Sequence, residues 1–103
     1  MKKITQEELN EILALHMIWL KSKGIQGAMA DLQGVIIKDA NLRSANLKDA
    51  NLQGAVIYDT DLRGANLEDA NLQGVKTRNL LLSGVNLNGA NLSRASLIKI
   101  DLS

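Results

Sequence analysis

The sequence predicts an all-β solenoid of four-sided coils that follows one N-terminal capping α-helix. Three observations support this prediction. Leucine or isoleucine occupies fourteen of the fifteen positions taken every fifth residue from Leu32 to Leu102, mostly with alanine two positions earlier. Glycine, aspartate, asparagine or serine occupies twelve of the fourteen positions that lie two residues after these centres. The first 24 residues lack the repeat and have the spacing of an amphipathic helix.

The N-terminal segment is predicted to form a helix that begins after Thr5. Thr5 and Glu8 have the spacing of a capping box, in which each side chain bonds to the backbone N–H of the other residue. Gly24 can end the helix. We expect its apolar side to cover the first coil, and we expect His16 to be a packed or partly exposed cap residue without a catalytic role. The apolar side comprises Leu9, Ile12, Leu13, His16, Met17 and Leu20.

A period of five suits neither a helix nor a strand. In a helix five residues advance by about 500°, so the leucines would spiral around the axis. In a strand, residues five apart face opposite sides. All the leucines can point to one axis only if the chain turns a corner in each repeat. The residue types two positions after the centres accept the positive φ of a type II turn, except Arg94 and Lys99, where we expect a different turn or fraying.

Departures from the repeat indicate that each coil has four sides. They gather in four segments that lie twenty residues apart: 35–39, 55–59, 75–79 and 95–99. Because twenty is four times five, these segments stack as a single wall if a coil has four sides. The repeats then make about 3.7 coils, which at an inter-strand spacing of about 4.8 Å form a rod about 17 Å tall.

Two polar features of the repeat also carry expectations. Thr77 is the only polar centre, and we expect its hydroxyl to bond to nearby backbone. Asparagines twenty residues apart fall into columns, which we interpret as amide ladders along the stack. One column holds Asn51, Asn71 and Asn91, and another holds Asn46, Asn66 and Asn86.

The repeats closely resemble those of the pentapeptide-repeat proteins. ADLQG, ANLRS, ANLKD and ANLQG match the consensus A(D/N)LXX of that family, as do DLRGANLEDANLQG and NLNGANLSRASL, and the match covers residues 30–102. The resemblance implies a right-handed quadrilateral β-helix. We expect the chain to divide into a cap helix with its connector, residues 1–29, and a repeat domain, residues 30–103. The resemblance implies no reaction.

Composition narrows the possible functions. The chain has 103 residues, enough for one small domain, with no cysteine and with twelve basic against eleven acidic residues. Its N-terminus carries Glu7, Glu8 and Glu11 before its apolar run, which does not fit a signal peptide, and no apolar segment reaches the roughly 20 residues that span a bilayer. We therefore expect a cytoplasmic protein without a membrane partner. No motif resembles a nucleophile with its base, a phosphate-binding loop or a metal site, so we expect no enzyme activity, no cofactor and no small-molecule substrate.

We expect a protein–protein interaction or scaffold module with an unidentified protein partner. The open last coil predicts a homodimer through the C-terminal coil, and the irregular wall is the competing dimer surface. The candidate surface residues are Ile36, Val56, Tyr58, Leu81, Ile98, Ile100 and Leu102.

Two other functions remain as alternatives. Resemblance implies the first, because some pentapeptide-repeat proteins protect DNA gyrase by imitating the DNA duplex. That imitation needs an acidic surface, yet residues 30–103 contain eight acidic and eight basic residues, which disfavours gyrase as a partner. The second is weak nucleic-acid binding through the Arg43/Arg63 and Lys38/Arg78 columns.

Overall fold

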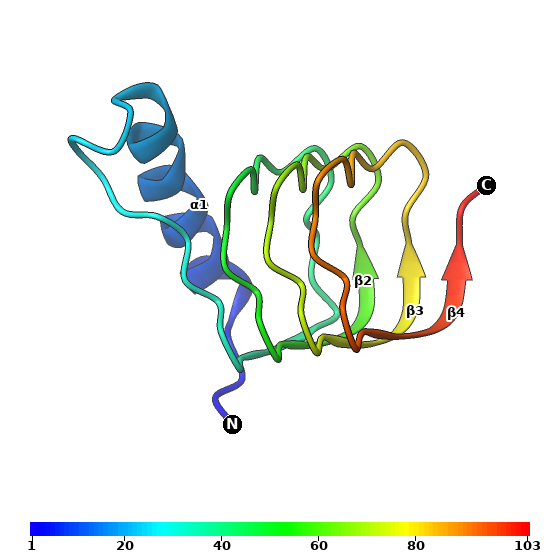
Figure 1. The fold of residues 1–103 in the computed structure, drawn as a ribbon. Helices are drawn as coiled ribbons and strands as arrows, with labels where there is room; N and C mark the ends of the chain where they lie inside the picture. The colour runs from blue at the N-terminus through cyan, green and yellow to red at the C-terminus, as the bar shows by residue number, and fades with distance from the viewer.

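The computed structural model describes residues 1–103 as one helix followed by a parallel β-solenoid (Figure 1). Its elements are α1 (Gln6–Lys21), β1 (Ile36–Lys38), β2 (Val56–Asp61), β3 (Lys76–Leu81) and β4 (Ser96–Asp101). The strands lie in the order β1-β2-β3-β4, and each pairs in parallel with the next at a shift of twenty residues. The predicted twenty-residue coil is therefore confirmed.

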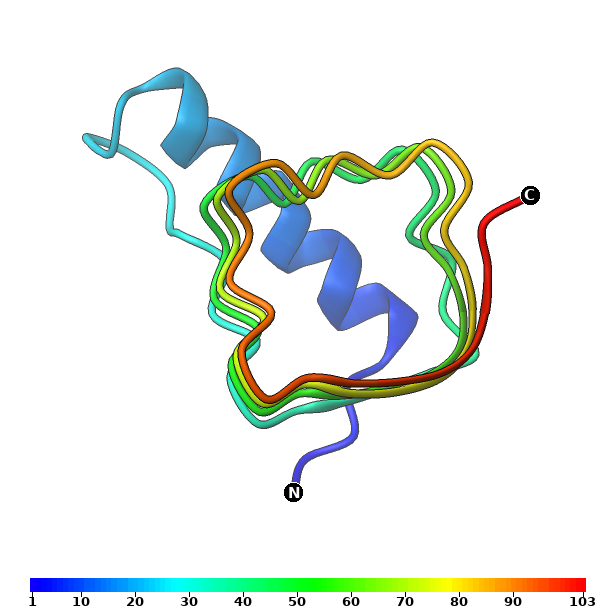
Figure 2. The same cartoon turned by 45° about the vertical axis from the view of Figure 1, so that its right-hand side comes forward.

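The coils are four-sided, and α1 lies across one end of the stack (Figure 2). The regular sheet covers one wall and continues around one corner onto the start of the next. On the other walls single bridges connect the coils, as where Asn51 pairs with both Asp31 and Asn71. The N–H of Leu32 donates to the carbonyl of Asn51 at 2.7 Å, and the same bond recurs in later coils. Backbone hydrogen bonds thus join neighbouring coils on every wall.

The core is a column of branched aliphatic side chains along the solenoid axis. The centres of the first coils are at most 1% exposed, as in Leu32, Leu47 and Leu52. Burying each such side chain contributes about 1.5–3 kcal/mol. Exposure rises toward the C-terminus and reaches 50% at Leu97, because no further coil covers that residue. Thr77 is buried among the centres, and its hydroxyl donates to the carbonyl of Ser96 at 3.1 Å, as predicted.

The corners depend on residues with left-handed backbone conformation. Every position two residues after a centre, from Gly34 to Lys99, has a positive φ. At most corners the centre's carbonyl accepts a hydrogen bond from the N–H three residues later, as between Leu42 and Ala45 at 3.1 Å. Arg94 has a φ of 59° and lies in a turn closed by the bond from the N–H of Ala95 to the carbonyl of Leu92 at 3.0 Å, so the expected change of turn or fraying was wrong there. Lys99 has a φ of 54°, but its corner has no such bond. The stacking register determines their conformation, although their side chains do not favour it.

One corner of each coil lacks this turn bond. β2, β3 and β4 continue through it, and the N–H of Asp39 donates to the carbonyl of Tyr58 in the next coil at 3.1 Å. Thr60 supports the corner, since its hydroxyl donates to the carbonyl of Tyr58 at 2.8 Å and accepts from the N–H of Ala40 at 3.4 Å. The sheet therefore bends around this corner without interruption.

The asparagine columns do not form the predicted amide ladders. The Oδ1 atom of each of these asparagines accepts from the backbone N–H two residues later, as Asn51 does from Gln53 at 3.0 Å. Between coils these columns make a single side-chain bond, from Asn71 Nδ2 to Gln53 Oε1 at 3.4 Å. The local bond prevails because an Asx turn satisfies the corner's own N–H without ordering a distant side chain.

Candidate interaction surfaces

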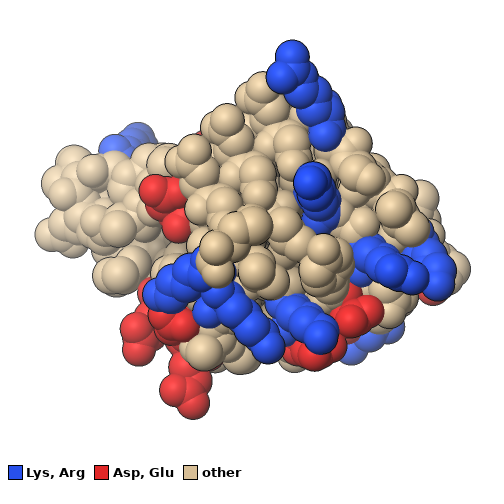
Figure 3. Space-filling model, turned by 90° about the horizontal axis from the view of Figure 1, so that it is seen from below, with Lys and Arg blue, Asp and Glu red and all other residues tan.

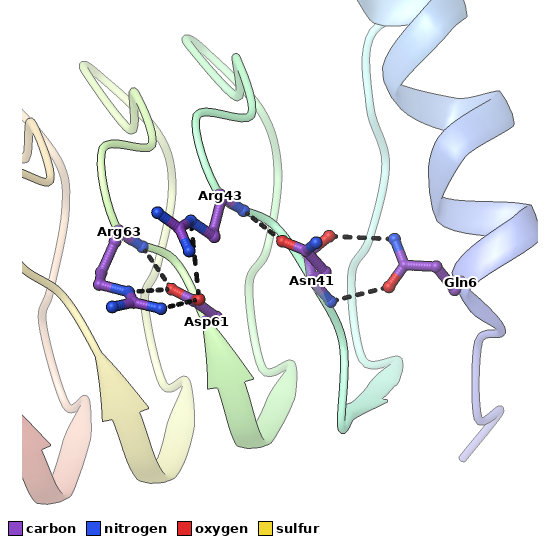
Figure 4. Close-up of polar contacts among 5 residues, drawn as sticks. All are labelled: Gln6, Asn41, Arg43, Asp61 and Arg63. Atoms are coloured by element: carbon purple, nitrogen blue, oxygen red, sulfur yellow. Dashed lines mark hydrogen bonds and ion pairs between the residues drawn. The ribbon is translucent and has the colours of Figure 1, made fainter.

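Side chains of α1 close the N-terminal end of the stack by replacing the backbone of a missing coil. Inside the stack, the N–H of Asp61 donates to Ala40, and its carbonyl accepts from Leu42. Asn41 occupies the same position in the first coil, where no earlier coil exists. The side-chain amide of Gln6 supplies both partners: Oε1 accepts from the N–H of Asn41 at 2.8 Å, and Nε2 donates to its carbonyl at 3.0 Å (Figure 4).

His16 closes a second part of this end. The ring is completely buried, and the N–H of Ala30 donates to Nδ1 at 2.9 Å. Because Nδ1 accepts, the proton of the neutral ring is on Nε2, which donates to the carbonyl of Lys48 at 2.7 Å. The ring also stacks on Trp19, with their centroids 5.6 Å apart. His16 is thus a packed cap residue, as predicted.

The residues before α1 cover the first edge of the sheet. The N–H of Ile36 donates to the carbonyl of Lys2 at 2.8 Å, and the N–H of Ile4 donates to the carbonyl of Ile36 at 2.9 Å. Ile4 is buried against the core. The N-terminal segment therefore covers the edge of the sheet at Ile36 and the core beside it.

The C-terminal end is open by comparison. Within residues 85–95, four amide groups that in earlier coils donate to the next coil donate to no group of the protein, and three carbonyls that in earlier coils accept from the next coil accept from none. The amides belong to Leu87, Gly89, Leu92 and Arg94, and the carbonyls to Val85, Ala90 and Ala95. Leu97 and Leu102 are 50% and 72% exposed beside them. This end presents unpaired backbone together with apolar side chains, a combination that favours association with another chain.

The wall that carries the sheet is hollowed and rich in cations. A hollow of about 750 Å³ lies over it, and only two of the ten lining residues, Tyr58 and Ile98, are hydrophobic. Its basic lining residues are Lys38, Lys76, Arg78 and Lys99. In Figure 3, which views the molecule from below, Lys and Arg side chains spread across the visible face.

A second group of charges lies around the corner from this wall and is internally paired (Figure 4). Arg63 donates to both carboxylate oxygens of Asp61 at 2.9 and 2.7 Å, and Arg43 Nε lies 3.9 Å from Asp61 Oδ2. The hydrogen bond from the Arg63 side chain is the main cause that lowers the pKa of Asp61 to about 2, and the same bond raises the pKa of Arg63. Asp61 thus offsets one of the two positive charges of the Arg43/Arg63 column, one of the two columns expected to contact nucleic acid.

The predicted interaction residues are distributed over three places. Ile98, Ile100 and Leu102 come together in the last coil, while Ile36, Val56 and Tyr58 lie on the sheet wall near its N-terminal edge. Val56 is only 9% exposed and lies between Ile36 and Lys76 of the two flanking strands, so it offers little surface to a partner. Leu81 is half-buried on the next wall, in register with Asp61 and Asp101.

Two further observations concern the whole chain. Nowhere do three or more acidic or histidine side chains gather closely enough to hold a metal ion. The helix is too short and too polar to cross a membrane.

Comparison with solved structures finds the same architecture. HetL from the cyanobacterium Nostoc sp. strain PCC 7120, a pentapeptide repeat protein involved in heterocyst differentiation regulation, superimposes with a TM-score of 0.62 at 36% identity, over 65% of this chain and 32% of HetL. QnrB1, a plasmid-mediated fluoroquinolone resistance protein, gives a TM-score of 0.66 at 22% identity, over 74% of this chain and 43% of QnrB1. The chain thus spans less than half of either protein, and the likeness to QnrB1 concerns the fold alone.

No curated protein sequence matches the chain. The family model for pentapeptide repeats matches eight copies over residues 30–64 and 65–103, and the chain therefore belongs to the pentapeptide-repeat family.

Proposed function

We propose that the chain is a protein–protein interaction module, not an enzyme, that forms a homodimer through its open C-terminal coil. The contrast between the two ends of the solenoid is the observation that supports this. Gln6, His16 and the residues around Ile4 bond to backbone of the first coil at Asn41, Ala30, Lys48 and Ile36, whereas the last coil has no such partner and keeps exposed leucines. Pairing that end with another chain would satisfy both kinds of group at once.

A second copy is the partner that fits this end best. Free donors and free acceptors occur on the same edge, so two copies related by a two-fold axis would bring donors of one against acceptors of the other. The same arrangement would cover Leu92, Leu97 and Leu102, which are 36%, 50% and 72% exposed. In such a dimer, residues 1–29 would act as the closing unit at each outer end and residues 30–103 as the repeat domain. We place this assembly in the cytoplasm.

Molar mass in solution tests the proposal. Light scattering after size exclusion, at micromolar to high micromolar concentration, is expected to give twice the chain mass of 11.2 kDa. Leu97→Lys is expected to give the monomer mass, since it places a charge in the proposed interface. Leu15→Lys is the matched control, because Leu15 is exposed to a similar degree, 46%, but lies on α1. A monomeric wild-type chain at the highest concentration would reject the homodimer.

Modulation of DNA gyrase receives no comparable support. Imitating a DNA duplex requires a negative surface, and residues 30–103 carry equal numbers of acidic and basic residues. The hollow over the sheet wall is lined by four cations. A gyrase supercoiling assay with the chain added is expected to show neither inhibition nor protection.

A further inference from the structure

We propose that the wall formed by β1–β4 binds single-stranded nucleic acid, with phosphates contacting its free cations and a base stacking on Tyr58. This activity lies beyond the proposed dimerisation and uses the side of the solenoid in place of its end.

The outward side chains of this wall form two rows that run along the solenoid. One row contains Ile36, Val56, Lys76 and Ser96, with Lys3 paired beside Ile36, and the other contains Lys38, Tyr58, Arg78 and Ile98. Neighbours within a row are about 4.8 Å apart, and the rows are separated by about 6.7 Å, the distance between alternate residues of a strand. Tyr58 therefore lies directly between Lys38 and Arg78.

The cations of this wall make no salt bridge, whereas those of the neighbouring group around Asp61 do. The four salt bridges of the protein use Lys2, Arg43, Lys48 and Arg63, none of which lies in the two rows. Five cations on or beside the wall make no salt bridge: Lys3, Lys38, Lys76, Arg78 and Lys99. Two carboxylates, those of Asp39 and Asp59, lie at its corner, and Asp59 already accepts from Asn79 Nδ2 at 2.8 Å. The wall is thus basic although the chain as a whole has a net charge of +1.

The arrangement around Tyr58 favours a single strand over other anionic partners. Tyr58 is 36% exposed inside the hollow, with a cation on each side along the row. Unpaired bases stack on aromatic side chains while their phosphates follow nearby cations, which is the usual pattern of single-strand recognition. Duplex DNA needs a more extended basic field than a nearly neutral chain supplies. An acidic peptide would use the cations but would give Tyr58 no role.

Fluorescence anisotropy of a labelled twelve-nucleotide oligouridylate, titrated with the intact chain at low salt, tests this proposal. Neutralising about four phosphate contacts predicts that log K falls with log salt with a slope of about −3. Lys76→Gln combined with Arg78→Gln is expected to weaken binding about tenfold or more and to reduce the magnitude of the slope by about 1.4. Tyr58→Leu is expected to weaken binding about fivefold or more at an unchanged slope, because stacking carries no charge.

The matched control is Arg43→Gln combined with Lys48→Gln, which removes the same charge from residues that are already paired on other walls. It is expected to retain wild-type affinity within about twofold. Circular dichroism confirms that each variant is folded before titration. No anisotropy change at low salt with the folded wild-type chain would overturn the proposal. Equal losses of affinity in the two double variants would also overturn it. An oligoglutamate peptide that competes as well as the oligonucleotide, together with an unchanged affinity in Tyr58→Leu, would instead identify a surface for acidic peptides.

Discussion

Gln6 and Asn41 face each other as two residues of neighbouring coils do. The side-chain amide of Gln6 accepts from the N–H of Asn41 at 2.8 Å and donates to its carbonyl at 3.0 Å. One side chain of α1 thereby satisfies a donor and an acceptor that every later coil satisfies with backbone. The geometry makes the stability of the solenoid depend on a residue outside the repeats.

Gln6→Glu tests this dependence, since two general effects predict opposite results. A carboxylate in the first turn of a helix ordinarily stabilises by about 0.3–1 kcal/mol. Here it would set an oxygen against the carbonyl of Asn41, and we expect the free energy of unfolding to fall by about 1–2 kcal/mol. Urea denaturation measures the change, with Glu11→Gln, an exposed position of α1, as the control. If the variant were as stable as the wild type or more so, the Gln6 side chain would not be acting as the hydrogen-bond partner of the Asn41 backbone.

His16→Leu is expected to lower the free energy of unfolding by at least about 2 kcal/mol, since it leaves the N–H of Ala30 and the carbonyl of Lys48 buried without partners. Met17→Leu, a change of similar volume at the next position of α1, should cost less than about 1.5 kcal/mol. Nitrogen NMR of the wild-type ring provides a direct check. It should show the proton on Nε2 alone, and a proton on Nδ1 would refute the assigned contacts.

Gly27→Ala is expected to loosen the connector from α1. A Cβ atom at Gly27 would clash with the carbonyl oxygen of Leu15 and lie 2.7 Å from the backbone nitrogen of Trp19, and Gly27 has a φ of +74°. Gly34→Ala provides the comparison, because Gly34 has a φ of +69° but open space around its Cβ direction. We expect the Gly34 variant to lose about 1–2 kcal/mol from backbone strain alone and the Gly27 variant to lose more. Equal losses in chemical denaturation would show that the contact with α1 contributes nothing.

Acid sensitivity should depend partly on Asp61. Its folded-state pKa is about 2, below the ordinary 3.8, chiefly because Arg63 donates to it. A lowered folded-state pKa means that the carboxylate stabilises the fold above about pH 4 and that this contribution is lost as the pH falls through about 2. We expect thermal melting of Asp61→Asn to change less than that of the wild type between these two values. Asparagine retains the oxygen that accepts the N–H of Arg63, as Asn41 does for Arg43. Identical acid profiles would contradict this assignment.

The coil was predictable from sequence because one physical constraint acts on every repeat. Leucines five residues apart can share an axis only if the chain turns once per repeat, and the irregular segments show that four turns complete a coil. Thr77 was also predictable, since a buried hydroxyl needs a partner. The conformation of Arg94 was not, because local preference opposes a φ that the stacked coils impose.

The surfaces were less predictable than the coil. Twenty-residue spacing identifies which side chains share a column, and it correctly grouped the segments of the sheet wall. It does not indicate which charges are paired, so Arg63, which is paired with Asp61, and Lys76, which makes no salt bridge, look alike in the sequence. Nor does it reveal the role of Gln6, because the position of a cap helix across the first coil depends on contacts between segments 35 residues apart.

Because paired strands are shifted by twenty residues, the rod can change in length without any change at its two ends. A duplicated block of twenty residues, such as 51–70, would add one coil and about 4.8 Å of length, while Gln6 would keep its contacts at the N-terminal end. An inserted block of five would instead rotate everything beyond it by a quarter turn, and the column from Lys38 through Tyr58 to Arg78 would be broken. Adding whole coils therefore preserves which side chains share a wall, whereas adding single repeats moves them to a different wall.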